Sequence, residues 1–143
     1  MKTKIKLIII AIFLLLTGCS DTVTEKYSTR NEAEQNKIFE RGWLPSIIPK
    51  SSTQIRTTND LDINTSSGEF KYDSKDTAEF MTNLMQYSGR KAPFQNWDSY
   101  INDQKKDGYI PYEYSNNQSV WIFFINQQKG QIKYNMWLLR KDS

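Results

Sequence analysis

Apolar residues are densest near the C-terminus, where they predict two strands joined by a tight turn. The run from Val120 to Ile125 is apolar on both faces, which is typical of a central strand that is covered on each side. Residues 131–140 alternate between apolar and polar, and we expect four side chains on the inner face: Ile132, Tyr134, Met136 and Leu138. Between the strands, Gly130 supplies the positive φ that a tight turn needs. The pattern therefore predicts a hairpin of residues 119–126 and 131–140.

Three segments have the periodicity or the end signals of helices. Residues 75–87 place apolar side chains at helical spacing, with a cap at Asp73 or Ser74 and a stop at Gly89. Its expected apolar face consists of Phe80, Met81, Leu84, Met85 and Tyr87. Residues 31–41 form a second candidate, with Asn31 as the N-cap, and residues 97–102 form a short third one.

The remaining strands are shorter. We expect one from Gln54 to Thr58, with a possible extension to Asn64, and another at residues 69–72. Residues 108–114 predict a further strand, and Pro111 favours an edge position because proline cannot donate to a ladder. The predicted fold class is α+β, with an antiparallel sheet of four to five strands and two or three helices.

The first eighteen residues have the pattern of a secretory signal peptide. Lys2, Lys4 and Lys6 precede an unbroken apolar run of ten residues from Leu7 to Leu16. Such a run is too short to cross a bilayer core of about 30 Å, which needs roughly 20 helical residues. It is typical of the apolar region of a cleaved signal.

The residues Leu16, Thr17, Gly18 and Cys19 resemble the lipobox of bacterial lipoproteins. This resemblance implies that a diacylglyceryl group alkylates the thiol of Cys19. Cleavage before Cys19 then frees its amine, which can be acylated with a fatty acid such as palmitate. One acyl chain holds a protein to a membrane marginally, whereas two or more hold it stably. We therefore expect a lipid-anchored protein of the cell envelope. Ser20, rather than Asp, after the cysteine favours the outer membrane facing the periplasm, and leaves the inner membrane or the cell surface as alternatives.

These signals divide the chain into three expected parts. Residues 1–18 are a lipoprotein signal peptide, and residues 19–30 are a lipidated cysteine followed by a polar tether. Residues 31–143 are a single α+β domain, large enough to bury one core.

Charge and composition exclude several classes of function. The net charge of +3 arises from the three lysines before Leu7, so the chain from Ser20 onward is neutral, with 16 basic and 16 acidic residues. Such a chain lacks the basic excess of a nucleic-acid-binding protein. It contains no His, and Cys19 is its only cysteine, which removes imidazole catalysis and internal disulfides.

The segment from Arg41 to Tyr72 resembles a known family. Its residues include Gly42-Trp43-Leu44-Pro45, Ile48-Pro49-Lys50-Ser51-Ser52, Ile55, Asp60-Leu61-Asp62-Ile63-Asn64 and Phe70. This pattern is similar to that of the YbbD-like small bacterial lipoproteins, which contain a head domain. No activity is established for this family, so the resemblance implies none for this chain. Some members lie beside Rhs-type polymorphic-toxin loci, which implies an immunity or accessory role.

Two carboxylates, Asp60 and Asp62, are the candidates for metal or acid–base chemistry. An EF-hand loop would need Gly and Glu where Thr65 and Lys71 stand, so the calcium pattern fails. We expect both carboxylates in solvent, with Leu61 and Ile63 turned inward. As a pair on one strand face, they are also the only candidates for glycosidase-like hydrolysis.

Eighteen aromatic residues follow Cys19, and they allow either a core or a binding platform. We expect the tryptophans to be mainly in the core, with Trp43 filling it beside Ile47 or Ile48. Tyr109, Tyr112 and Tyr114 form the predicted binding surface, on a strand edge that would accept a partner strand.

The sequence thus predicts a membrane-anchored lipoprotein that acts by binding a protein in the envelope, and the family resemblance implies an immunity or accessory role. We expect no enzymatic activity, no cofactor and no bound metal. The alternative is a glycan-binding or hydrolytic envelope domain that uses Asp60, Asp62 and exposed aromatic residues.

Overall fold

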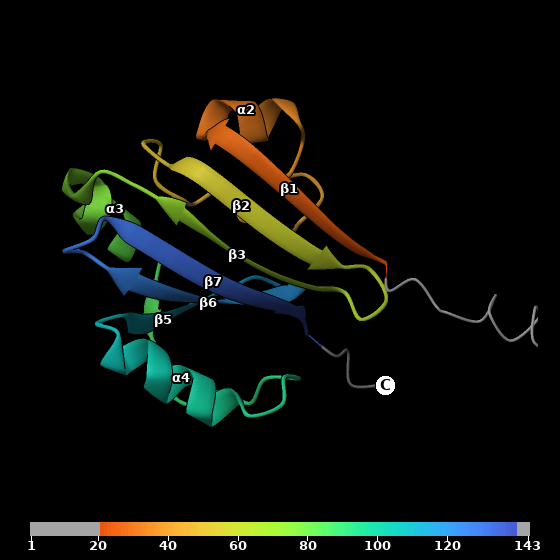
Figure 1. Ribbon diagram of the computed structural model, residues 1–143, viewed down its shortest axis with the longest axis vertical. Coiled ribbons are helices and arrows are strands. Elements are labelled where there is room, and N and C mark those ends of the chain that lie inside the picture. The colour runs from red at the N-terminus through yellow and green to blue at the C-terminus, as the bar shows by residue number, and fades with distance from the viewer. Residues whose placement is uncertain (1–20, 140–143) are drawn as a thin grey trace, which may run out of the picture.

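The computed structural model describes residues 21–139, which form an antiparallel sheet with helices on both of its faces (Figure 1). The sheet has seven strands in the order β1-β2-β3-β7-β6-β5-β4. The strands are β1 (Thr22–Thr29), β2 (Thr53–Asp60), β3 (Thr65–Lys71), β4 (Met85–Gln86), β5 (Ile110–Ser115), β6 (Ser119–Asn126) and β7 (Gln131–Leu138). The helices are α2 (Arg30–Gln35), α3 (Thr77–Met81) and α4 (Trp97–Lys106), with a 3₁₀ turn, η2, at Ser74–Asp76. The antiparallel α+β class is confirmed, but there are more strands than expected.

The C-terminal hairpin is formed as predicted. β6 pairs with β7 from Ser119 opposite Leu138 to Asn126 opposite Gln131, and Gly130 in the turn has a φ of 57°. All eight residues of β6 are buried. Leu138 is the exception on the expected inner face, because it is exposed at the end of β7.

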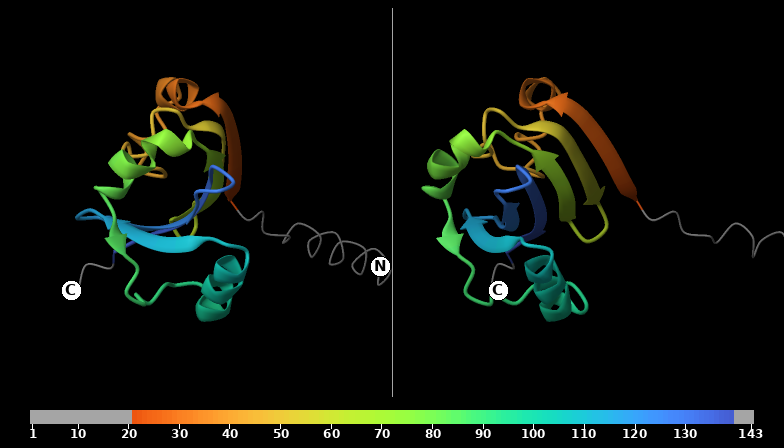
Figure 2. Two further views of the ribbon diagram at one scale, coloured as in Figure 1. Left: turned by 90° about the vertical axis from the view of Figure 1, so that its left-hand side faces the viewer. Right: turned by 60° about the vertical axis from the view of Figure 1, so that its left-hand side comes forward.

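The sheet is strongly curved and divides the interior into two cores (Figure 2). Inside the curve, α2, α3 and the loop between α2 and β2 pack on the sheet, and Trp121, Phe123 and Ile125 point into this inner core. On the outside, α4 covers β5 to β7, and Val120, Ile122 and Phe124 point into this outer core. Side chains in a strand alternate between faces, so β6 supplies both cores in turn.

The polar segment that we expected to be a tether is strand β1. Seven of its residues pair with β2, from Thr22 opposite Asp60 to Thr29 opposite Thr53. Only Tyr27 of this strand is buried. Backbone hydrogen bonds to β2, rather than a periodic apolar face, hold β1 in the sheet, so hydrophobic periodicity missed it.

Helix α2 is shorter than predicted and begins one residue earlier, at Arg30. Its N-cap is Thr29, whose Oγ1 accepts a hydrogen bond of 3.2 Å from the Glu32 backbone N–H. The Glu32 side chain in return accepts one of 2.7 Å from the Ser28 N–H. This exchange is close to a capping box. The helix ends at Gln35, since Lys37 adopts a φ of 58°.

The helix predicted at residues 75–87 is confirmed only in part. Asp73 caps η2 through the Lys75 N–H, and α3 ends at Met81. Met85 and Gln86 then pair with β5 as strand β4, which leaves Met85 exposed. Pairing with the sheet edge therefore overrides local helix propensity. β5 is therefore not the edge strand that we predicted. However, β4 pairs only with Glu113 and Tyr112, so Pro111 pairs with β6 alone.

Between residues 21 and 139, none of the helices has the length and apolar composition that crossing a membrane requires.

Candidate functional site

Within residues 21–139, no helix lies over the outer face of β1, β2 and β3, since α4 packs on β5 to β7 (Figure 2). Antiparallel pairing places residues that lie opposite each other on the same face. Lys26 is opposite Arg56, Arg56 is opposite Glu69, and Glu69 is opposite Lys133. These four residues therefore form one row across β1, β2, β3 and β7, which we call the outer row.

The outer row is basic. Lys26 and Arg56 are exposed, and among the described residues no carboxylate oxygen lies within 4.0 Å of their side-chain nitrogens. Glu69 is its only acidic member. Because the chain from Ser20 onward is neutral, this local excess of positive charge favours contact with an acidic surface.

Hydrogen bonds position Glu69 and Lys133, the two members of the outer row on β3 and β7. The Glu69 Oε2 accepts from the Gln131 Nε2 at 3.1 Å, and the Gln131 Oε1 accepts from the Tyr109 hydroxyl at 2.7 Å. The Lys133 ammonium donates to the Gln104 Oε1 at 3.1 Å and lies 4.6 Å from the centroid of the Tyr109 ring. Lys133 is thus held against α4, whereas Lys26 and Arg56 point into solvent.

Two shallow hollows flank Arg56 and Glu69 on this face. One lies towards α4 and is lined also by Thr58, Tyr100 and Lys133, and the other lies towards β1 and is lined also by Lys26 and Gln54. Both are open rather than enclosed. Such a surface suits contact with another macromolecule better than sequestration of a small substrate.

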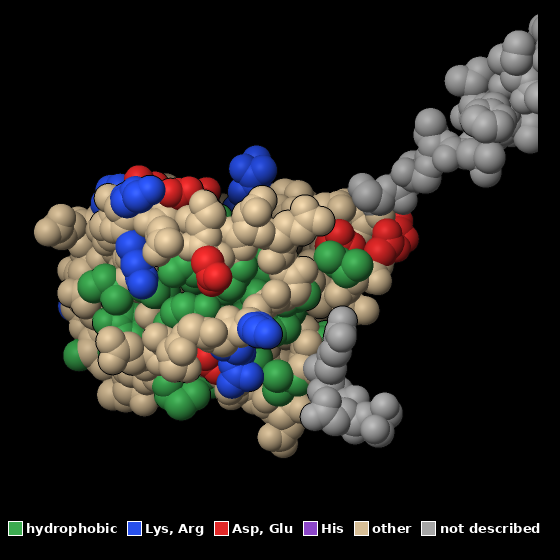
Figure 3. All heavy atoms as spheres, turned by 90° about the horizontal axis from the view of Figure 1, so that it is seen from below, with side chains coloured by type: hydrophobic (Ala, Val, Ile, Leu, Met, Phe, Trp, Pro, Cys, Tyr) green, Lys and Arg blue, Asp and Glu red, His purple; other side chains and the backbone are tan. Residues whose placement is uncertain are grey.

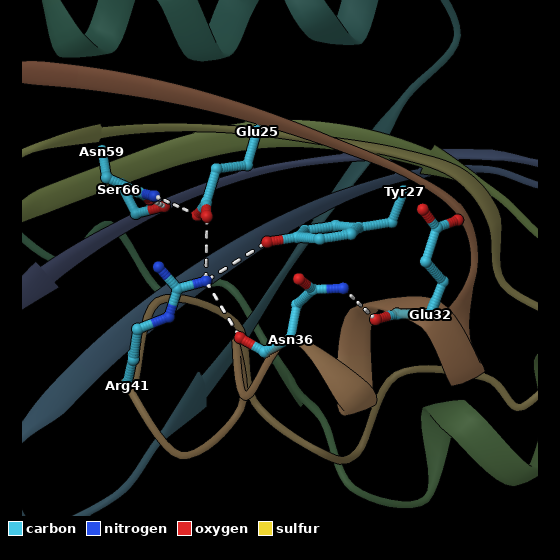
Figure 4. Close-up of polar contacts among 7 residues, drawn as sticks. All are labelled: Glu25, Tyr27, Glu32, Asn36, Arg41, Asn59 and Ser66. Atoms are coloured by element: carbon cyan, nitrogen blue, oxygen red, sulfur yellow. Dashed lines mark hydrogen bonds and ion pairs between the residues drawn. The ribbon is translucent and has the colours of Figure 1, made fainter.

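Behind this face, a polar network fixes β1 to the loop after α2 (Figure 4). The Arg41 Nη2 donates to the Glu25 Oε1 at 3.0 Å, to the Tyr27 hydroxyl at 3.2 Å and to the Asn36 carbonyl at 3.3 Å. The hydrogen bond to Glu25 raises the pKa of the Arg41 guanidinium. Burial, followed by the neighbouring Glu25, raises the pKa of the Tyr27 phenol.

The network continues across the sheet to β7. The Asn59 Nδ2 donates to the Glu25 Oε2 at 3.5 Å, and the Ser66 hydroxyl donates to the Asn59 Oδ1 at 2.7 Å. Since that proton is used, the Tyr134 hydroxyl donates to the Ser66 Oγ at 3.0 Å. Burial raises the pKa of Tyr134 far above its usual value. The phenol therefore keeps its proton and remains a hydrogen-bond donor in this network.

Gly68 makes this contact between β3 and β7 possible. A Cβ at residue 68 would lie 2.7 Å from the Tyr134 Cε1 and would also collide with the Arg56 carbonyl oxygen. Because Gly68 has no side chain, the Tyr134 ring can lie against β3 and its hydroxyl can reach Ser66.

Asp60 and Asp62 lie at the end of β2 and in the turn after it, not as a pair on one strand face. Asp60 ends β2, and its Oδ1 accepts hydrogen bonds from the backbone N–H groups of Asp62 at 3.0 Å and Ile63 at 3.3 Å. Asp62 is exposed in the turn that follows. The expectation that Leu61 and Ile63 point inward is wrong, because both are exposed.

The three predicted tyrosines do not share one surface. Tyr109 is buried in the outer core beneath Lys133. Tyr112 and Tyr114 are partly buried against the inner core, where the Tyr114 ring lies 5.5 Å from the Trp121 ring. The strand turns successive side chains to opposite faces, so this cluster in sequence is divided in space.

The tryptophans form no exposed platform. Trp97, Trp121 and Trp137 are buried, which confirms their core assignment. Trp43 is only partly buried, and its carbonyl accepts a hydrogen bond of 3.2 Å from the Trp121 Nε1. The neighbouring Leu44, with no exposed surface, fills the core position that we expected for Trp43.

The predicted lipidation site lies outside the described residues, as does the whole lipobox of Leu16, Thr17, Gly18 and Cys19. Within residues 21–139, no group of three His, Cys, Asp or Glu side chains could hold a metal ion.

Sequence reasoning missed the outer row because it requires the register of four strands. The capping signal was visible, since Thr29 and Glu32 stand three residues apart as a capping box requires. No local pattern joins Lys26 to Arg56 or Arg41 to Glu25.

The fold defines an α+β protein built on a curved antiparallel sheet, with a basic outer row on an open face of that sheet. Residues 21–71, which run from β1 to the end of β3, match the family model of the YbbD head domain. This match confirms the resemblance to the YbbD head domain for this segment and extends it towards the N-terminus, across β1 and α2. No curated protein and no solved structure matches the chain.

Proposed function

We propose that this protein is a lipid-anchored envelope lipoprotein that binds a protein partner through the outer row. The observation that carries the binding proposal is the uncovered outer face of β1 to β3, on which Lys26 and Arg56 have no ion-pair partner among the described residues. An acidic patch on a partner fits this surface by charge.

The anchor proposal rests on the sequence, where Leu16, Thr17, Gly18 and Cys19 follow a charged segment and an apolar run. The YbbD head domain match is compatible with an envelope protein. The favoured location is the outer membrane facing the periplasm, and an association with a polymorphic-toxin locus would make the partner a toxin.

A binding role without enzymatic activity also fits the chemistry of the described surface. Asp60 is occupied by turn hydrogen bonds, and the Tyr134 phenol is held protonated in a buried network. The alternative of a glycan-binding or hydrolytic domain needs two convergent carboxylates beside exposed aromatic rings. Asp60 and Asp62 have no such neighbours here, since the nearest exposed large side chains are the aliphatic Leu61 and Ile63.

Mass spectrometry of the membrane-extracted protein tests the anchor. We expect an N-terminal Cys19 that carries acyl chains, and we expect Cys19→Ser to remain unprocessed and unacylated. An intact Met1 in the wild-type protein would contradict the proposal.

Site-specific photocrosslinking in the native host tests the binding surface. A photoreactive residue in place of Thr24, beside the outer row, should yield one discrete crosslinked species, whereas the same residue in place of Glu34 on α2 should not. Lys26→Glu with Arg56→Glu should abolish the crosslink from residue 24.

The matched control for this charge reversal is Lys50→Glu with Lys91→Glu, which changes the net charge equally at exposed positions away from the outer row. The control should leave the crosslink intact. Equal loss in both variants would show a general charge effect and would contradict a specific site at the outer row.

A further inference from the structure

Exposed apolar side chains gather at one end of the sheet. Among residues 21–139, six large hydrophobic side chains are exposed, and four of them lie at this end: Val23 at the start of β1, Leu61 and Ile63 between β2 and β3, and Leu138 at the end of β7. The described chain also begins and ends here (Figure 1). Figure 3 shows hydrophobic and acidic side chains side by side at one end of the molecule.

The turn between β2 and β3, residues 61–64, is the most exposed part of this end. Ile63 is 64% exposed and Leu61 is 43% exposed. The turn is held by the Asp60 carboxylate, which accepts from two of its backbone N–H groups, and by Asn64, which has a φ of 52°. Leu61 and Ile63 are therefore presented outward by a fixed turn.

The same turn is tied to the start of the described chain. The Leu61 N–H donates to the Asp21 carbonyl oxygen at 3.0 Å. Cys19 precedes Asp21 by two residues, and two extended residues span at most about 7 Å. If Cys19 carries acyl chains, the covalent chain leaves no long spacer between the bilayer surface and this turn.

We propose that Leu61 and Ile63 enter the interface of the bilayer that holds the acyl chains of Cys19, as a second membrane contact that orients the domain. The inference rests on the proposed lipidation. Apolar side chains gain by leaving water for the acyl boundary, as the apolar faces of interfacial helices do. Three neighbouring carboxylates, Asp21, Asp60 and Asp62, suit the level of zwitterionic headgroups and disfavour an anionic lipid surface.

This contact sets the orientation of the whole sheet. The turn between β6 and β7, residues 127–130, lies at the opposite end of the strands and would point away from the membrane. The outer row would then face sideways, above the bilayer surface and open to a partner.

Fluorescence of the acylated full-length product in phosphatidylethanolamine vesicles tests the proposal. Transfer of the diacylglyceryl group alkylates the Cys19 sulfur to a thioether, so in the lipidated protein an introduced cysteine is the only free thiol. A polarity-sensitive probe on Ile63→Cys should shift to shorter wavelength and be quenched several-fold by a quencher attached to the lipid. The same probe on Gln128→Cys, at the far turn, should show neither effect.

The outcomes separate this inference from the anchor itself. Protein that floats with the vesicles while the residue 63 probe emits as in water would overturn the second contact and leave lipidation standing. Protein that fails to float would overturn both. A probe shift in native membranes but not in pure lipid vesicles would assign the turn to a protein partner and also overturn the proposal.

A second measurement uses no probe. Vesicles should slow amide hydrogen exchange of residues 61–64 several-fold in the acylated wild-type protein. Leu61→Ser with Ile63→Ser should still float through Cys19 but should lose this protection. Equal protection in the wild type and the double variant would contradict insertion of these side chains.

Discussion

Strands β1 and β6 have eight residues each, yet their surroundings differ completely. Every residue of β6 is buried, whereas Tyr27 is the single buried residue of β1. β6 lies between two neighbours and two cores, while β1 is an edge strand with α2 and its following loop on one face only. The matched head-domain segment, β1 to β3, is thus the polar half of the sheet, and β4 to β7 is the apolar half.

The two halves are joined by β3 and β7, which pair over seven residues from Thr65 opposite Trp137 to Lys71 opposite Gln131. The head-domain segment obtains much of its inner core from Phe123, Ile132 and Tyr134, which lie outside the family match. This difference suggests a division of labour, in which the apolar half supplies stability and the polar half supplies surface.

The largest expected effect is in the apolar half. Phe123→Ala removes a ring with no exposed surface that packs 5.3 Å from the Phe80 ring. We expect a loss of about 3–5 kcal/mol in the free energy of unfolding, measured by chemical denaturation of residues 20–143. Thr24→Ala on β1 is the control and should change stability by at most about 0.5 kcal/mol. Similar losses for the two variants would contradict the division between the halves.

The junction between the halves should be the next most sensitive. Gly68→Ala places a methyl group against the Tyr134 ring and the Arg56 carbonyl, which should cost about 1–3 kcal/mol as an overpacked position. In Gly42→Ala the new methyl group meets no atom within 4 Å, so this variant loses stability only through the positive φ of 78° at residue 42. Denaturation curves should therefore rank Gly68→Ala as the more damaging change, and the reverse order would place Tyr134 away from β3.

Alkaline pH should also loosen this junction. The pKa of Tyr134 is raised by burial above its ordinary value of 10.0, so the native state retains a proton that the unfolded state releases. Stability is therefore complete below pH 10 and falls above it, by about 1.4 kcal/mol for each pH unit. In Tyr134→Phe, denaturation at pH 9 and 11 should show a smaller difference than in the wild type. An unchanged difference would assign the loss to other tyrosines.

The ion pair of the polar half should contribute less. Arg41→Met leaves Glu25 without its partner, but both side chains are partly exposed, at 40% and 24%, so we expect a loss of about 1 kcal/mol or less. High salt should shrink the difference between the variant and the wild type. A loss as large as that of Phe123→Ala would show that the polar network supports the fold as strongly as the core does.

The smallest effect should be at the outer row. Lys26→Ser with Arg56→Ser removes two exposed side chains that pair with no carboxylate among the described residues. The free energy of unfolding, measured by thermal denaturation, should therefore stay within about 0.5 kcal/mol of the wild type. Loss of the crosslink at residue 24 with unchanged stability would separate binding from folding. A marked destabilisation would instead give these side chains a structural role.

Hydrophobic pattern alone determined the central hairpin of the apolar half, β6 and β7. Residues 120–125 and the alternation after Gln131 predicted the central hairpin, because a strand between two cores carries its burial in its own side chains. The buried Trp121 followed from the same pattern. The Gly-Trp-Leu-Pro pattern at residues 42–45 also indicated the family that the match to residues 21–71 confirms.

Only the tertiary structure decided where β1, β4 and the outer row lie. β1 and β4 are held by backbone hydrogen bonds to neighbouring strands, and those bonds leave no periodic trace in the side chains. The outer row depends on the register of four strands, since Lys26 and Lys133 lie more than a hundred residues apart in sequence. Likewise, Leu61 and Ile63 resemble core residues in sequence, and only the turn held by Asp60 shows that they face outward. A periodic run of apolar residues predicts which side chains of a strand are buried. The alignment of charged side chains across a sheet depends instead on which strands pair and in which register.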